Sequence, residues 1–151
     1  MLDFAVEHRE PLNTIMGDRE MKLRDYKLSE EDWRIAVQLC NILKIFKHTT
    51  LFFSRSTPSI AMVIPAMDHI DAHLATAASS GIYSVAIKAA LAIGKHTLNQ
   101  YYSKTDHLEV FRIAMVLHPR HKLKYFEKAG WQADWIDEAR SIVETEFKRS
   151  Y

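Results

Sequence analysis

The order of apolar and polar positions predicts helices along almost the whole chain. The clearest pattern runs over residues 29–54, where apolar residues recur at intervals of three and four, the spacing of one helix face. Ser29 stands at the expected N-cap, and Asp32 follows three residues later in an acidic form of the capping box. The longest helix is therefore predicted to begin near Ser29. Its apolar stripe consists of Trp33, Ala36, Val37, Cys40, Leu43 and Phe46.

Six further segments carry a helical pattern. Residues 1–16 are loosely periodic and interrupted by Pro11, and the polar residues 17–28 are typical of a connection. The other five segments are residues 57–80, 84–104, 105–118, 121–130 and 131–151. No segment shows a period of two that rivals these patterns. The sequence therefore predicts an all-α fold, an irregular multi-helix bundle of about six or seven helices, in a single domain over residues 1–151.

Local signals set the expected helix boundaries. Thr57 followed by Pro58 predicts a helix start, because the first turn does not need the amide that proline lacks. Pro65 predicts a kink within the same helix, since its ring is incompatible with a straight helical ladder. The remaining boundary signals are caps at Thr105 or Asp106 and at Asp134, and a glycine stop at Gly130.

Composition narrows the class of protein. Hydrophobic residues make up 48% of the 151 positions, enough to form a core. The single cysteine, Cys40, excludes an internal disulfide and indicates an intracellular compartment. We interpret Cys40 as a small core residue. The N-terminus has no basic region followed by an apolar stretch, so no signal peptide is predicted. Charges interrupt every apolar run before it reaches the length of a membrane span, so we expect no membrane partner.

Charge is distributed unevenly although the formal net charge is only +1. Residues 1–32 hold nine acids and five bases, whereas residues 84–128 hold eight bases and three acids. This basic zone consists of Lys88, Lys95, Lys104, Arg112, Arg120, Lys122, Lys124 and Lys128. A zone of this kind attracts phosphate weakly. On sequence alone the preferred interpretation is an ordinary solvated helix face rich in lysine.

Candidate catalytic and metal-binding patterns are weak. His69 and His73 are four residues apart and share a helix face, as in helical zinc pairs. Ile70 stands where the HExxH motif has its glutamate, so a solvated helix surface is the preferred interpretation. The four glycines are isolated and form no phosphate-binding loop. Trp33, Trp131 and Trp135 occupy positions expected of core aromatics, with stacking on nucleic-acid bases as the alternative. We expect no catalytic residue, metal or cofactor.

The segment from His118 to His121 predicts a bend between two helices. Pro119 disfavours helical angles at His118, and Tyr125 and Phe126 are expected to anchor the following helix to the core. Arg120, Lys124 and Lys128 succeed one another at intervals of four and are predicted to share one helix face. The bend explains every residue type except the two histidines, which would add positive charge as the pH falls toward 6.

Three stretches carry a resemblance to a known family. They are "LSEEDWRIAVQLCNILKIFKHTTLFFSRSTPSIAMVIPAMDHIDAHL", "YYSKTDHLEVFRIAMVLHPRHKLKYF" and "WIDEARSIVETEF". In order and spacing they resemble the hAT superfamily of DNA transposases, especially those of fungal genomes, over nearly the whole chain. One departure is that the aspartate of the family's LDPR motif is replaced by His118.

The resemblance implies a place within a larger protein. Such transposases carry a BED zinc finger, a ribonuclease-H-like catalytic core and a C-terminal dimerisation region, and a large all-helical domain is inserted in the core. This chain resembles part of the inserted domain. The family's two catalytic aspartates and its Arg-Trp pair would lie upstream and its catalytic glutamate downstream, so no catalytic residue is carried over and no enzyme activity is expected.

The expected partners and location follow from the same resemblance. We expect weak, non-specific contact with DNA, contact with the remainder of a transposase, and a nuclear location. The alternative is a domesticated helical module that binds a protein partner.

Overall fold

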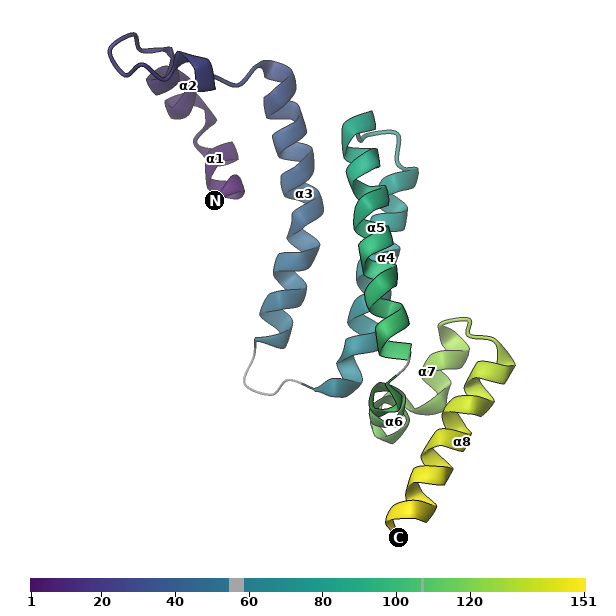
Figure 1. Cartoon of the computed structure of the whole chain (residues 1–151). Coiled ribbons are helices and arrows are strands. Elements are labelled where there is room, and N and C mark those ends of the chain that lie inside the picture. The colour runs from purple at the N-terminus through teal and green to yellow at the C-terminus, as the bar shows by residue number, and fades with distance from the viewer. Residues whose placement is uncertain (55–58, 107) are drawn as a thin grey trace.

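The computed structural model describes residues 1–54, 59–106 and 108–151, and every regular element among them is helical (Figure 1). The predicted all-α class is confirmed, with eight α-helices in the described residues, one or two more than expected. In chain order the elements are α1 (Leu2–Glu7), α2 (Arg9–Gly17), the 3-10 turn η1 (Arg24–Tyr26), α3 (Glu30–Phe53), the 3-10 turn η2 (Ile60–Met62), α4 (Val63–Ser79), α5 (Val85–Asp106), α6 (Glu109–Leu117), α7 (Lys122–Lys128) and α8 (Ala133–Ser150).

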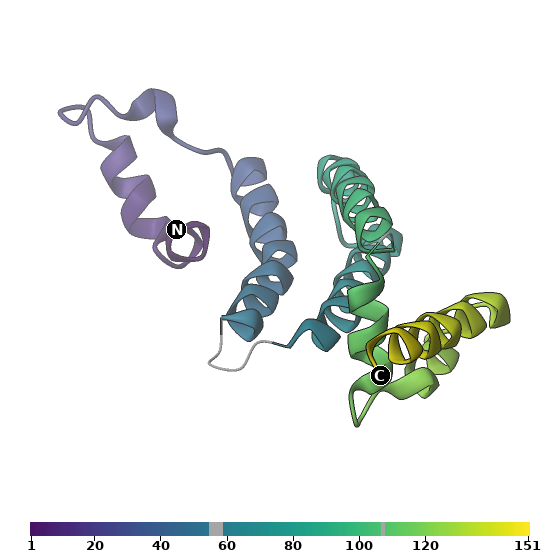
Figure 2. The same cartoon turned by 60° about the horizontal axis from the view of Figure 1, so that its bottom comes forward.

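The helices form an elongated arrangement around the long helices α3, α4 and α5. Helices α1 and α2 lie on one side of α3, and the α4–α5 hairpin lies on the other (Figures 1 and 2). Helices α6, α7 and α8 gather where the C-terminal end of α5 meets the N-terminal end of α4. The two chain termini consequently lie on opposite sides of the molecule.

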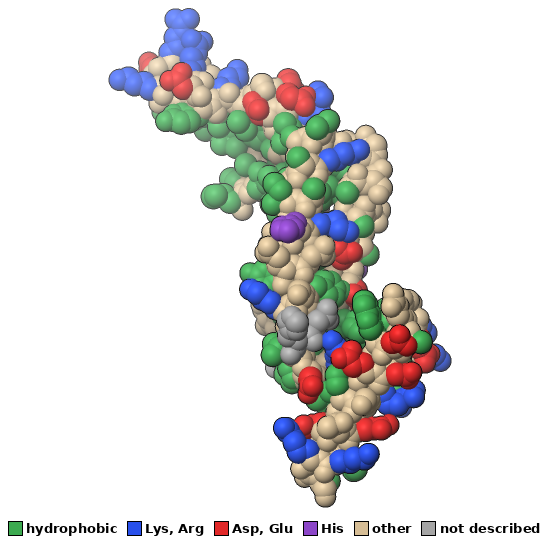
Figure 3. All heavy atoms as spheres, turned by 45° about the vertical axis from the view of Figure 1, so that its right-hand side comes forward, with side chains coloured by type: hydrophobic (Ala, Val, Ile, Leu, Met, Phe, Trp, Pro, Cys, Tyr) green, Lys and Arg blue, Asp and Glu red, His purple; other side chains and the backbone are tan. Residues whose placement is uncertain are grey.

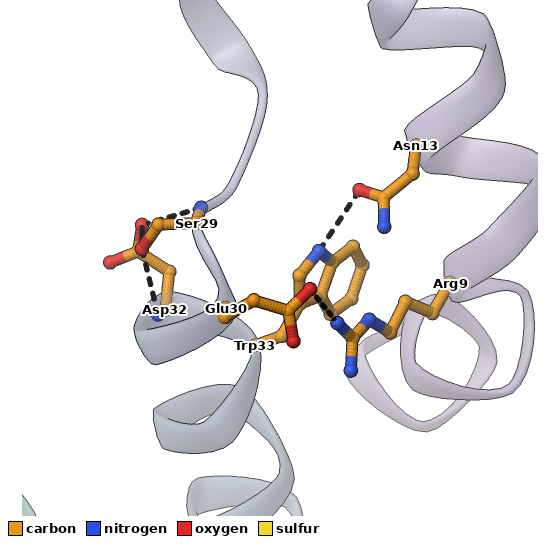
Figure 4. A network of polar contacts seen from close by, with 6 residues as sticks. All are labelled: Arg9, Asn13, Ser29, Glu30, Asp32 and Trp33. Carbon is orange, nitrogen blue, oxygen red and sulfur yellow. Dashed lines mark hydrogen bonds and ion pairs between the residues drawn. The ribbon is translucent and has the colours of Figure 1, made fainter.

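Helix α3 begins where the sequence predicts and is the longest, with 24 residues. The Ser29 hydroxyl accepts a hydrogen bond from the backbone N–H of Asp32 at 3.2 Å. In return, the Asp32 carboxylate accepts from the backbone N–H of Ser29 at 2.9 Å (Figure 4). The predicted capping box is therefore confirmed, and it satisfies amides that a helix start leaves without partners.

The apolar stripe predicted for α3 is wrong in part, because α3 is apolar on two opposite faces. Trp33 and Cys40 are buried on the predicted face, whereas Val37, Leu43 and Phe46 remain exposed. The larger core lies on the opposite face and joins α3 to the α4–α5 hairpin. It consists of Ile42, Ile45, Ile70, Leu74, Ala77, Ile87 and Leu91.

A second core cluster holds the C-terminal helices together. It consists of Ala61, Ile64, Met115, Phe126 and Ala139. Helix α7 within it stops as predicted at Gly130, whose φ of 76° suits glycine. The N–H of Gly130 donates to the carbonyl of Glu127, and that of Trp131 donates to the carbonyl of Phe126. This paired pattern is the Schellman motif, and it turns the chain sharply into α8.

Two prolines act at helix starts rather than inside helices. Pro65 is the third residue of α4, so the predicted kink is wrong. Pro11 is the third residue of α2, and the interruption expected at Pro11 falls earlier, at His8. Each proline ring would clash with the carbonyl four residues upstream, so the helix cannot extend backward past the first turn.

Two predicted caps are also wrong. The Thr105 hydroxyl donates to the carbonyl of Tyr102 at 2.7 Å in the last turn of α5, so it does not cap α6, which begins after Leu108. Asp106 likewise belongs to α5. Asp134 lies inside the first turn of α8, after the N-cap residue Gln132. The start predicted at Thr57 and Pro58 lies outside the described residues.

Candidate nucleic-acid interface

The bend predicted at Pro119 joins α6 to α7. His118 ends α6 in an extended conformation, with φ −70° and ψ 128°, as expected of a residue before proline. The rings of His118 and His121 pack together with centroids 4.5 Å apart. His121 also meets the edge of the Tyr125 ring and places its Nε2 3.3 Å from the sulfur of Met62. The two histidines are therefore packing residues of the bend.

The protonation of His121 is affected by this packing. Burial, followed by the positive charges of His118 and Arg120, lowers the pKa of His121. The imidazole consequently stays neutral to lower pH than an exposed histidine does. The extra positive charge expected from His121 near pH 6 is therefore reduced.

The densest part of the basic zone is exposed at the bend and along α7. Arg120, Lys122, Lys124 and Lys128 are all exposed. We call these four residues the α7 basic cluster. Arg120 precedes the helix, and Lys122 has a φ of 52°, so the prediction that Arg120, Lys124 and Lys128 share a helix face is wrong for Arg120. Lys124 and Lys128 do lie one turn apart on α7.

The other four residues of the basic zone lie on α5 and α6 and differ from the α7 basic cluster in their contacts and exposure. Lys95 forms an ion pair with Asp71 of α4 at 3.0 Å, and Arg112 forms one with Glu138 of α8 at 3.1 Å. The Arg112 side chain is only 12% exposed. Lys104 lies over the ring of Tyr101, and Lys88 is half-buried near the start of α5. Lys95 and Arg112 thus join helices to one another and present less charge to solvent.

A cleft of ≈ 790 Å³ lies beside the α7 basic cluster, between α4, α5, α6 and the C-terminal helices. At its wall, the Asp68 carboxylate accepts hydrogen bonds from the hydroxyls of Tyr102 and Tyr125, the latter at 2.5 Å. Burial, followed by the Asp68 carboxylate, raises the pKa of both tyrosine hydroxyls. Both hydroxyls therefore remain protonated donors at neutral pH. We call these three residues the Asp68 clamp.

The other polar groups of the cleft are balanced. Asp71 and Glu138 belong to the two ion pairs just described, and Lys128 also lines the cleft. Trp131 and Trp135 line the same cleft with their rings edge to face. Trp135 is 53% exposed, so its assignment to the core is wrong, whereas Trp33 is buried as predicted. The lining of the cleft accordingly includes both an exposed indole and a lysine.

The histidine pair on α4 gains no third ligand in the described residues. His69 is exposed and lines the cleft, whereas His73 is half-buried. No group of three or more His, Cys, Asp or Glu side chains able to hold a metal occurs in the part of the chain that the structure describes.

Sequence reasoning missed the Asp68 clamp. Tyr102 is 34 residues and Tyr125 is 57 residues from Asp68 along the chain, so no local sequence pattern predicts these contacts. Tyr125 was expected to anchor α7 to the core, and its ring does pack there. Its hydroxyl adds a polar contact that only the three-dimensional arrangement reveals.

Comparisons with known proteins return one distant relative. The chain is 27% identical over 123 residues to a protein of Talaromyces stipitatus named "Putative transcriptional regulator tpeD". The match covers 80% of this chain and 12% of that protein, so the chain spans a small part of the length of its relative. No family model and no solved structure match the chain. No helix among the described residues is long and apolar enough to cross a membrane.

Proposed function

We propose that this chain is a helical DNA-facing module of a hAT-type transposase, or of a protein derived from one, without strand-cleaving activity of its own. The observation that carries the proposal is the exposed α7 basic cluster, which lies in the motif "LHPRHKLKYF" except for Lys128, two residues after it. A relative named as a transcriptional regulator is compatible with a DNA-handling parent protein. A nuclear location is part of the same proposal.

The proposed contact is electrostatic. Phe126 is fully buried and Tyr125 is clamped to Asp68, so α7 is fixed to the fold and presents Lys124 and Lys128 without reorganisation. Lysine and arginine contacts to phosphate position a protein on DNA but carry no sequence information. The module would therefore hold DNA for catalytic residues located elsewhere in a larger polypeptide, with a Kd of roughly 10⁻⁴ to 10⁻⁶ M at physiological salt.

Fluorescence anisotropy with a labelled duplex tests the proposal. Changing Arg120, Lys124 and Lys128 together to alanine should weaken binding and reduce the slope of log K against log salt by about three, because each lost phosphate contact contributes about one. A matched control changes one arginine and two lysines at exposed positions remote from α7. It consists of Arg19→Ala, Lys27→Ala and Lys47→Ala. Equal binding by the two triple variants would refute the α7 basic cluster as the interface.

The absence of strand cleavage is tested separately. A nuclease-free preparation, incubated with supercoiled plasmid and Mg²⁺ or Mn²⁺, should leave the plasmid intact. Reproducible nicking that disappears when one acidic residue of this chain is changed would overturn that part of the proposal.

A second candidate function is a domesticated module that binds a protein partner. The observation that favours it is the amount of apolar surface left uncovered on α3, where Val37, Leu43 and Leu51 are all exposed. A module used only in this way would bind duplex DNA, even at low salt, no more tightly than the variant in which Arg120, Lys124 and Lys128 are changed to alanine.

A further inference from the structure

The cleft between α4 and the C-terminal helices contains an exposed aromatic surface. Trp135 is the third residue of α8 and is 53% exposed. Its ring meets that of Trp131 edge to face, with centroids 5.9 Å apart. Trp131 in turn packs against the fully buried Phe126, with ring centroids 4.6 Å apart. The indole of Trp135 is thus supported by the core although about half of the residue faces solvent.

An aromatic ring held in this way favours a flat ligand. Stacking on aromatic side chains stabilises unpaired nucleic-acid bases and tolerates any base, because every base has a π-face. A platform that is fixed before binding also loses little conformational freedom when a ligand arrives. The cleft volume of ≈ 790 Å³ lies within the range of roughly 300–1,000 Å³ that is typical of ligand sites. The cleft therefore offers both the volume and the aromatic wall that a nucleotide base requires.

The charges of the cleft favour a neutral group inside it. The ion pairs with Lys95 and Arg112 balance the carboxylates of Asp71 and Glu138. Figure 3 shows acidic and basic side chains interspersed around the C-terminal helices on the face that it draws. Such a surface attracts a free ion of either sign only weakly, because the field of each charge is largely cancelled by its neighbour. A neutral base with polar edges suits this lining better than an ion does.

Polar side chains of the lining can bond the edges of a base and hold its phosphate. Asn99 of α5 and His69 of α4 are exposed in the cleft and carry hydrogen-bond donors and acceptors. Lys128 belongs both to the lining and to the α7 basic cluster, and Lys124 lies one turn earlier on α7. A phosphate bound by Lys128 therefore carries its base next to the cleft.

Only an unpaired base could use such a site, because each base inside a duplex is covered on both faces by its neighbours. We propose that the cleft takes one unpaired base of a DNA strand held by the α7 basic cluster, with the base stacked on Trp135 and its phosphate on Lys128. This inference rests on the proposed function, since it requires DNA at the α7 basic cluster. It adds a preference for unpaired over paired strands.

The test compares three labelled DNA molecules by fluorescence anisotropy. They are a blunt duplex, the same duplex with a short single-stranded overhang, and the same duplex with an overhang of abasic nucleotides. The abasic overhang keeps every phosphate, so its comparison with the base-bearing overhang isolates the contribution of the bases. The base-bearing overhang should bind about 5- to 150-fold more tightly than the abasic one, the range expected for stacking of one base.

Variants of two exposed aromatic residues of α8 assign this difference to the cleft. Trp135→Ala should make the affinities for the two overhangs equal, whereas Trp135→Phe, which retains an aromatic ring, should keep part of the difference. Phe147→Ala is the matched control, because Phe147 is 63% exposed on the same helix and does not line the cleft. It should keep the whole difference. Circular dichroism reports whether each variant keeps its helices.

The outcomes separate this inference from the proposed function. Equal affinity of the natural chain for the two overhangs, or an unchanged difference in Trp135→Ala, would overturn the inference. An equal loss in Phe147→Ala would also overturn it. The blunt duplex tests the proposed function independently, because it has phosphates but offers no unpaired overhang. Binding of the blunt duplex through the α7 basic cluster, without discrimination between the overhangs, would leave the proposed function standing.

Discussion

The N-terminal region, residues 1–28, consists of short helices, whereas the C-terminal region, residues 109–151, combines two short helices with the 18-residue α8. Both regions pack beside the central helices α3, α4 and α5. In the C-terminal region Met115, Phe126 and Ala139 are completely buried. In the N-terminal region α1, α2 and η1 contain no buried residue. The C-terminal region is thus part of the core, whereas the N-terminal region rests on the surface of α3.

Polar contacts hold the N-terminal region in place. Arg9 pairs with Glu30 and lies over the Trp33 ring, and the Trp33 indole donates to Asn13 at 3.0 Å (Figure 4). The Asp3 carboxylate accepts from the Cys40 thiol, and this contact raises the pKa of the thiol. Exposed polar contacts contribute little each. The N-terminal region should therefore open locally, whereas the C-terminal region should open only with the whole fold.

The largest expected effect is at Phe126. Changing Phe126 to alanine leaves a cavity between α4, α6 and α8 and should reduce the free energy of unfolding by about 3–5 kcal/mol. Urea denaturation followed by circular dichroism measures the loss. The same substitution at Phe4, which is 61% exposed, should cost less than about 1 kcal/mol. Equal losses at Phe126 and Phe4 would show that the two regions contribute equally to the free energy of unfolding.

An intermediate effect is expected at Asn13. Asn13→Ala removes the acceptor of the Trp33 indole N–H and should cost about 1 kcal/mol. Because the N-terminal region opens locally, amide hydrogen exchange should become roughly fivefold faster in α2 and stay unchanged in α6, α7 and α8. Thr14→Ala is the neighbouring control, since its hydroxyl bonds only within α2. Faster exchange throughout the chain would mean that the two ends open together.

The smallest effect is a pH dependence that belongs to the C-terminal region. Burial lowers the pKa of His121, so the unfolded chain takes up a proton at higher pH than the folded chain does. Stability from this group is therefore complete above the ordinary histidine pKa near 6.5 and is lost as the pH falls below it. Denaturation at pH 7.5 and pH 5.5 should show this loss in the natural chain and a smaller one in His121→Gln. Identical losses in both proteins would contradict the assignment.

Patterns within a few residues predicted the local structure well. Ser29 and Asp32 placed the start of α3, Gly130 placed the end of α7, and Pro119 placed the bend, because each acts on backbone amides or angles nearby. Thr105 and Asp134 failed as caps because a hydroxyl or carboxylate at a helix end has several backbone partners within reach. The choice among them depends on where the neighbouring helix runs.

Packing between distant segments was less predictable. The apolar periodicity identified one apolar face of α3. The larger core is formed by the opposite face, which carries Ile42 and Ile45. A prediction of one apolar stripe cannot describe a helix that has two apolar faces. The exposed part of the basic zone was anticipated at Lys124 and Lys128. The ion pairs that occupy Lys95 and Arg112 were not, because their partners, Asp71 and Glu138, are more than twenty residues away.

The Asp68 clamp has a geometric consequence for the whole molecule. One carboxylate on α4 fixes the end of α5 through Tyr102 and the middle of α7 through Tyr125. Three helices thus meet at this carboxylate. Its two hydrogen bonds act together with the core cluster that includes Ile64, Met115 and Phe126 to set the angle at which the C-terminal helices leave the α4–α5 hairpin. That angle determines the direction in which Lys124 and Lys128 face relative to the rest of the molecule. A substitution at Asp68 would change the direction in which these two lysines face without changing the lysines themselves.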